Sequence, residues 1–222
     1  MTYLVPHSPE KEICISNSGS LSGMTFLCKD MCDIKGFKSS CGNPDFYKHS
    51  TEALDYAPFL KKILNEGAIL KGITICDEFF YSIIGENKHY GTPENLNSPN
   101  CVPGGSSSGS AAALTNHDFD FTIGTDTGGS VRVPASFCGV FGFRPTHGRI
   151  DLNKVYPMAK SFDTLGWFSN NKPNMLKLGK IFFDNFREIQ IEQKNILIPT
   201  DIVDDLDHNI KSQFYDYCEY KF

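Results

Sequence analysis

Apolar positions along this 222-residue chain follow a period of two in some segments and a helical period in others. Apolar runs over 24–28 and 68–75 predict two strands. The segment 53–65 between them predicts a helix, because its apolar residues recur at helical spacing. These apolar positions are Ala57, Leu60, Ile63 and Leu64. The next stretch is ambiguous over 79–84 and has the composition of a loop over 85–105.

The second half of the chain continues this alternation. A short run over 140–143 predicts a buried strand, and helical spacing predicts a helix over 173–186, followed by a strand over 195–198. The apolar stripe of that helix consists of Met175, Leu178, Phe182 and Phe186. A last helix is expected over 204–222, with Ile210, Phe214, Tyr217 and Cys218 on its apolar side. Alternation of this kind favours an α/β fold in which helices cover both faces of a sheet.

Two turns rich in glycine and serine lie near the middle of the chain, over 103–110 and 124–130. A small-residue helix candidate over 110–115 and an apolar run over 119–123 join them. Glycine adopts φ values closed to other residues, so the second turn can direct several backbone N–H groups into one concavity, as an oxyanion hole requires. The first turn alone has the composition of a flexible linker, but the apolar residues after it and the second turn argue against that interpretation.

A lysine inside an apolar run is the candidate base. Lys29 ends the run 24–29, and burial there would lower its pKa because desolvation disfavours the charged ammonium. A lysine in such a run more often keeps its ammonium in water at a strand edge, so only the conjunction with both serine turns favours Lys29 as a base. Asp30 follows directly, yet neighbouring side chains on a strand point to opposite faces, so the two residues need not pair.

Composition restricts the function classes. Hydrophobic residues make up 40% and charged residues 21% of the chain, values typical of one globular domain with its own core. The net charge of −5 without a basic tract gives no indication of nucleic-acid or anionic-membrane binding. No apolar run reaches about 18 residues, and the first residues lack the charged start and apolar core of a signal peptide. We therefore expect a cytoplasmic protein without membrane association.

Cysteine and histidine spacing gives little support to metal or cysteine chemistry. The eight cysteines are scattered through apolar segments and are expected to be reduced. The spacing of Cys28, Cys32 and Cys41 would suit zinc, but no fourth ligand is evident, so no metal is expected. No histidine stands near an aspartate in a recognisable motif. A Ser-His-Asp triad could therefore form only from residues that the fold brings together. His89 is expected at a pocket rim or in a plain loop.

The stretches GGSSSGSAAA and GTDTGGSVRVPASFCGVFGFRPTHG resemble the signature of the amidase signature family, serine hydrolases that cleave carboxamides with a Ser-Ser-Lys triad. The resemblance extends upstream through FLCKD and GITICDEFFYSIIGENKHYGTPEN, and it covers about residues 22–168. The GENKHYGTP segment looks most like the plant-type indole-3-acetamide amidases and their chloroplast outer-envelope relatives. The resemblance implies one amidase signature domain over 1–222, with a mixed sheet between helices. Family members usually continue well beyond this point, so we expect a C-terminally truncated chain with an incomplete fold.

The resemblance also implies roles for residues in the two turns. Ser130 would be the nucleophile, and Ser106, which follows a cis peptide bond from Gly105, would pass the proton of Ser130 to Lys29. The oxyanion would be held by the backbone N–H groups of Thr127, Gly128 and Gly129 together with that of Ser130. The Ser107 hydroxyl would have a supporting role. Asp126 and Arg132 are expected to form a structural pair beneath the loop and not to act as catalytic groups. No cofactor is implied.

The expected function is hydrolysis of a carboxamide to a carboxylate and ammonia through an acyl-enzyme, on a small aromatic amide such as indole-3-acetamide. Two alternatives stay open. The chain could be the A-type glutaminase subunit of a glutaminyl-tRNA amidotransferase, which the DEF at 77–79 also resembles, or a non-catalytic binding module like the envelope relatives. The expected partners are the amide substrate and a second copy or another chain that completes the fold.

Overall fold

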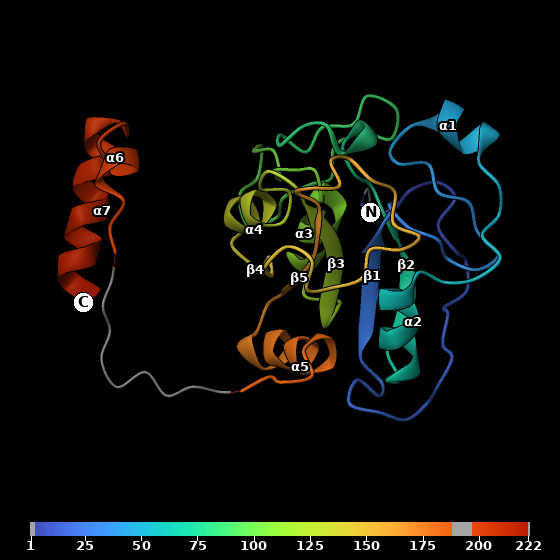
Figure 1. Ribbon diagram of the computed structural model, residues 1–222. Coiled ribbons are helices and arrows are strands. Elements are labelled where there is room, and N and C mark those ends of the chain that lie inside the picture. Colours follow the sequence, from blue (N-terminus) through green and yellow to red (C-terminus); the bar gives the residue numbers. More distant parts are fainter. Residues whose placement is uncertain (1–2, 188–196, 222) are drawn as a thin grey trace. The chain divides into compact units, whose positions relative to one another are not determined.

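The computed structural model describes residues 3–187 and 197–221 (Figure 1). The chain divides into two compact units, Met1–Phe186 and Arg187–Phe222, and each is described by itself. The expectation of a single domain over residues 1–222 stays a prediction.

The first unit is built on a five-stranded sheet with the strand order β2-β1-β3-β5-β4. β1 is parallel to both of its neighbours, whereas β5 is antiparallel to β3 and β4. The sheet is therefore mixed, as expected. Its strands are β1 (Thr25–Lys29), β2 (Ile69–Thr74), β3 (Phe121–Asp126), β4 (Phe141–Phe143) and β5 (Thr164–Ser169).

Helices cover both faces of this sheet (Figure 1). Side chains along each strand alternate between the two faces, so neighbouring residues of one strand pack against different helices. Phe26 and Cys28 of β1 pack in the large core cluster that contains residues of α2 and α5. Leu27, between them, packs with Ala113 of α3 on the other face. The helices that border the sheet are α2 (Pro58–Asn65), α3 (Ser108–Leu114), α4 (Arg132–Cys138) and α5 (Lys172–Phe182). Lys29 has the same parity as Leu27 and points to the α3 face.

The two edges of the sheet differ. The N-terminal segment pairs with β2, since the Val5 N–H donates to the Ile73 carbonyl and Ile13 forms a bridge with Leu70. β4 forms the opposite edge, and its Phe141 and Phe143 are 44% and 42% exposed. The expectation of a buried strand over 140–143 is therefore right in type but wrong in burial, because β4 is the last strand of the described sheet and has a neighbouring strand on one side only.

Element boundaries differ from the expected ones where proline or backbone geometry intervenes. The helix predicted over 53–65 begins only at Pro58, because a residue before proline disfavours helical φ and ψ. The helix predicted over 173–186 ends at Phe182, and Phe183 is already extended. Of the strand predicted over 195–198, residues 195 and 196 lie outside the described residues, and residues 197 and 198 are not in a strand. The sequence pattern missed α4 and β5, and it also missed the short helices over Pro44–His49 and Thr200–Val203.

Shorter elements complete the two units. The first unit also contains α1 (Pro44–His49) and a 3₁₀ turn, η1 (Glu78–Phe80), within the stretch that was ambiguous from sequence. The second unit contains α6 (Thr200–Val203) and α7 (His208–Lys221), so the last helix starts four residues later than expected. Within the described ranges, no helix combines the length and apolarity needed to cross a bilayer.

Candidate active site

The side chain of Lys29 lies at the carboxyl end of β1 and is fully buried. Its Nζ donates to the Ser106 hydroxyl at 2.8 Å and to the Thr125 hydroxyl at 3.1 Å. The Phe80 ring covers it, with 4.6 Å between Nζ and the ring centroid. The structure therefore brings the candidate base into direct contact with the candidate relay serine, over 77 positions of sequence.

Burial lowers the pKa of Lys29, because desolvation penalises the ammonium. The nearby carboxylates of Asp77 and Asp126, and the thiols of Cys76 and Cys41 where they ionise, act in the opposite direction without cancelling the effect of burial. Burial also raises the pKa of the Cys41 thiol to about 12 and that of the Cys76 thiol well above its usual value. Both thiols are therefore neutral around Lys29, so neither supplies the counter-charge that would hold the ammonium protonated.

The first glycine-serine turn presents Ser106 to Lys29. The peptide bond between Gly105 and Ser106 is cis, as the resemblance implies. A Cβ on Gly105 would lie 2.4 Å from both carboxylate oxygens of Asp77, so no larger residue fits there without displacing that carboxylate. The Asp77 N–H donates to the Ser106 carbonyl at 3.2 Å. The backbone on both sides of the Ser106 side chain is thus packed against or hydrogen-bonded to Asp77.

The two turns are tied together through Ser107. Its hydroxyl donates to the Thr125 carbonyl at 3.2 Å, and its backbone N–H donates to the Ser130 carbonyl at 3.3 Å. These bonds place Ser130, the candidate nucleophile, beside the turn that carries Ser106. Among the described residues no side chain forms a hydrogen bond with the Ser130 hydroxyl, so the Lys29–Ser106 link is formed and the Ser106–Ser130 link is not.

Asp126 organises the second turn from beneath. Its fully buried carboxylate accepts from the Gly129 N–H at 2.8 Å and from the Val131 N–H at 3.1 Å. The Arg132 guanidinium binds the same carboxylate through Nε at 3.0 Å and Nη2 at 2.9 Å. Arg144 Nε approaches it to 3.3 Å. Asp126 and Arg132 therefore form the expected ion pair, in which Asp126 is buried and the Arg132 side chain is 57% exposed.

Burial by itself raises the pKa of Asp126, but the Arg132 side chain and the N–H groups of Val131 and Arg132 outweigh it, so the pKa lies below its ordinary value. The hydrogen bond to Asp126 raises the pKa of Arg132 in turn. Asp126 is therefore an anion over the whole range in which an amidase would work.

The backbone donors of the second turn are not all available to a substrate. The Gly129 N–H is used by Asp126. Within residues 3–187 and 197–221, no hydrogen bond uses the N–H groups of Thr127, Gly128 or Ser130. Three of the four predicted oxyanion donors thus remain, and the Thr127 hydroxyl is anchored to Asp163 at 2.6 Å.

Ser130 borders a cavity of about 210 Å³. The nucleophile candidate is 5% exposed, so its contact with solvent is through this cavity. Most of the other lining residues are apolar or aromatic, and they come from the segment after β2 and from one loop methionine. The complete lining is Phe80, Tyr81, Ser82, Ile83, Gly128, Ser130 and Met158.

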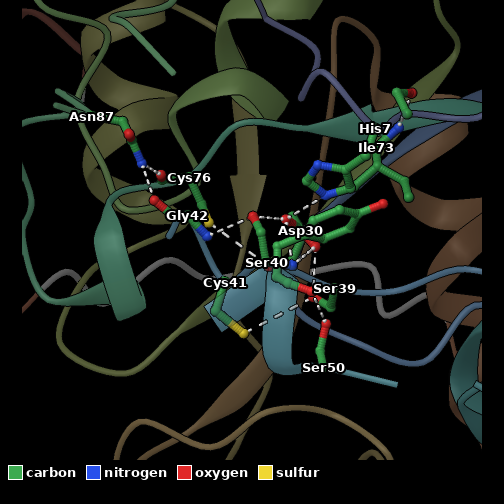
Figure 2. Close-up of polar contacts among 12 residues, drawn as sticks. His7, Asp30, Ser39, Ser40, Cys41, Gly42, Ser50, Ile73, Cys76 and Asn87 are labelled. Atoms are coloured by element: carbon green, nitrogen blue, oxygen red, sulfur yellow. Dashed lines mark hydrogen bonds and ion pairs between the residues drawn. The ribbon is translucent and has the colours of Figure 1, made fainter. Parts of the chain in front are cut away.

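A second polar cluster, which the sequence pattern did not reveal, surrounds Asp30 (Figure 2). Asp30 is 2% exposed and points away from Lys29, as strand alternation predicts. Its carboxylate accepts from the Ser39 hydroxyl at 2.5 Å, from the Ser40 N–H at 3.0 Å and from the Ser40 hydroxyl. His7 Nε2 lies 3.2 Å from the carboxylate, and its ring stacks on Tyr47.

This cluster contains serine, histidine and aspartate but has the wrong order for a proton relay. A catalytic histidine stands between serine and aspartate and takes the proton of the serine. Here the carboxylate of Asp30 stands in the middle, and both serines donate to it. The cluster therefore fixes the loop 39–42 and the N-terminal segment against the end of β1.

The remaining candidate groups do not assemble. Cys28 and Cys32 have their sulfurs 3.8 Å apart, and Cys41 contacts Ser39 instead of completing that pair. In the described part of the chain no three His, Cys, Asp or Glu side chains are grouped closely enough to hold a metal ion. His89 binds Glu78 at 3.1 Å.

Known proteins resemble this chain across most of the first unit. A family model described as Amidase matches residues 8–182. "Amidase 1" of Arabidopsis thaliana is 48% identical over 84% of the chain, and "Translocon at the outer membrane of chloroplasts 64" of Pisum sativum is 41% identical over 82%. A solved structure described as "Crystal structure of amidase" has a TM-score of 0.80 at 29% identity and covers 90% of the chain.

The chain is shorter than these proteins. It spans 44% of the Arabidopsis relative, 30% of the pea relative and 46% of the solved amidase chain.

Replacing Asp126 by asparagine should lower the free energy of unfolding by about 2 kcal/mol at neutral pH, because several charge-assisted hydrogen bonds are weakened at once. The pKa of Asp126 is lower in the folded chain than in the unfolded one. Its stabilisation is therefore complete above the ordinary carboxyl value of 3.8 and is lost as pH falls through the folded pKa. Urea unfolding of both proteins at several pH values checks this.

Asp45→Asn is the matched control, since it breaks an exposed ion pair with Lys48. That variant should unfold like the unchanged chain. A difference between Asp126→Asn and the unchanged chain that persisted in strong acid would contradict the assignment of an anionic Asp126.

Proposed function

The chain belongs to the amidase signature family, and on that premise we propose that it hydrolyses a carboxamide to a carboxylate and ammonia. Ser130 is the nucleophile, Ser106 the relay and Lys29 the base. The observation that carries this proposal is the 2.8 Å contact between a fully buried lysine amine and the Ser106 hydroxyl. Because burial favours the neutral amine, this lysine can act as a base at a lower pH than an exposed lysine could.

Acylation then proceeds in two proton transfers. The Ser130 oxygen attacks the amide carbon while its proton moves to Ser106, whose own proton moves to Lys29. The carbonyl oxygen becomes an oxyanion held by the N–H groups of Thr127, Gly128 and Ser130; a single such donor contributes about 10²–10³-fold in rate. When the C–N bond breaks, the proton returns through Ser106 to the departing ammonia and leaves an ester on Ser130.

Deacylation repeats these steps with water. A water molecule gives its proton to Ser106 and attacks the ester, and the carboxylate leaves as Ser130 regains its proton. No cofactor takes part in this sequence.

The proposed substrate is a small aromatic primary amide such as indole-3-acetamide. The apolar lining of the cavity at Ser130 supports it, since Phe80, Tyr81, Ile83 and Met158 offer contacts to an aromatic acyl group. The likeness of the GENKHYGTP segment to plant-type amidases supports it as well. A cytoplasmic location, and a partner that completes the fold, stay proposals of the same kind.

The purified chain should release ammonia from indole-3-acetamide, and Ser130→Ala should remove that activity while the circular dichroism spectrum stays unchanged. A fluorophosphonate should label Ser130 in the unchanged chain and leave Ser130→Ala unlabelled. Ser136→Ala is the matched control, because Ser136 is an exposed residue of α4 and that variant should still be labelled. Ammonia release from glutamine alone would favour the amidotransferase alternative. Correct folding without labelling or turnover would favour a binding module.

The hydrolysis rate should rise with pH as Lys29 loses its proton, with a midpoint below the ordinary lysine value of 10.5 because burial lowers the folded pKa. The rate should persist in EDTA, since a lysine base needs no metal-activated water. A pH series of initial rates with and without EDTA measures both properties. Loss of activity to EDTA that zinc restores would overturn the mechanism.

A further inference from the structure

Phe80 contacts the candidate base and also lines the substrate cavity. Its ring centroid is 4.6 Å from Lys29 Nζ, and the residue is 5% exposed. The same residue lines the cavity that Ser130 borders. Phe80 therefore contacts the buried amine with its ring and also lines the substrate space.

The backbone holds this ring in an unusual conformation. Phe79 and Phe80 have φ values of 48° and 65°, a left-handed region that residues with bulky side chains rarely adopt. The Phe79 N–H donates to the Cys41 carbonyl at 2.8 Å, and the Phe80 N–H donates to the Asp77 carbonyl at 2.9 Å. Strained conformations of this kind persist where the surroundings enforce them, and they concentrate at functional sites.

We propose that Phe80 is a positioning residue for the base: its ring separates Lys29 from the water of the substrate cavity, so that protons reach Lys29 through Ser106 alone. This inference rests on the proposed function, because it assigns a role in the Ser-Ser-Lys relay. Phe80 itself exchanges no proton and forms no bond with the substrate.

Two effects of the ring oppose each other. An aromatic face attracts an ammonium and so favours the protonated lysine, by about thirtyfold in an equilibrium constant at a desolvated site. Exclusion of water favours the neutral amine, and full burial can change the ionisation constant of a lysine by about a thousandfold or more. Exclusion of water is therefore the larger of the two effects on the protonation of Lys29, and loss of the ring should make Lys29 more basic.

Other groups around Lys29 do not depend on the ring. Cys76, Asp77, Cys41 and Asp126 act on its pKa through charge. Ser106 and Thr125 contact it by hydrogen bonds. A substitution at Phe80 leaves these groups in place, so a change in the titration of Lys29 reports on water access.

The test is a titration of the complete chain, labelled with ¹³C at the lysine ε-carbon and observed by NMR. Lys29→Met identifies the Lys29 resonance. In Phe80→Ala the midpoint of that resonance should move upward toward 10.5, and the fluorophosphonate labelling rate at neutral pH should fall about tenfold and recover in alkali. Phe80→Gly should behave alike, and because glycine accepts a φ of 65° it guards against misfolding of the alanine variant.

Phe80→Leu separates the two effects, since leucine excludes water but has no aromatic face. Its midpoint should stay low. Tyr81→Ala is the matched control: Tyr81 is 81% exposed and lines the same cavity, and its loss should leave the midpoint unchanged. A midpoint that stays in place or falls in Phe80→Ala and Phe80→Gly would overturn the inference. Absence of amide hydrolysis by the unchanged chain would overturn the proposed function, while the titration still decides the role of Phe80.

Discussion

The burial of one amine determines how this site is built. Lys29 has no contact with solvent, and its Nζ is held by two hydroxyl groups and an aromatic ring. An ammonium in such a place carries a large desolvation cost, and that cost favours the neutral form that a base requires. The thiols beside it stay neutral, so no thiolate offsets that cost. The Phe80 ring covers the amine, and the Ser106 and Thr125 hydroxyls are its hydrogen-bond partners.

The sheet and the glycines make this enclosure of the amine possible. β1 and β3 are parallel neighbours, so their carboxyl ends bring Lys29 and Asp126 to the same edge of the sheet. Asp126 holds the turn of Ser130 from beneath, while Ser107 joins that turn to the one that carries Ser106. Gly105 allows the backbone to approach the Asp77 carboxylate, where a Cβ would clash. The site is thus fixed by backbone contacts between segments far apart in the sequence.

The sequence predicted the parts of this arrangement that depend on local pattern. Strand alternation correctly separated Lys29 from Asp30, and the run 24–28 lies in β1. Contacts that depend on the folded backbone could not be predicted from the sequence. Examples are the hydrogen bond from the Gly129 N–H to Asp126, the Phe80 ring over Lys29, and the His7–Asp30 pair. The pattern also failed for the strand over 140–143, because apolar residues mark an edge strand and a buried one alike. The roles assigned to Ser130 and its neighbours stay predictions.

The central claim is that Ser130 carries the acyl group of an amide, with Lys29 drawing its proton through Ser106. Mass spectrometry of the chain, quenched in acid during hydrolysis of indole-3-acetamide and then digested, tests it most directly. The account predicts that the peptide containing Ser130 gains the mass of the indole-3-acetyl group minus one hydrogen, and that Lys29→Met gains none. Turnover with the acyl group on another residue, or with no acyl group on any peptide, would contradict it.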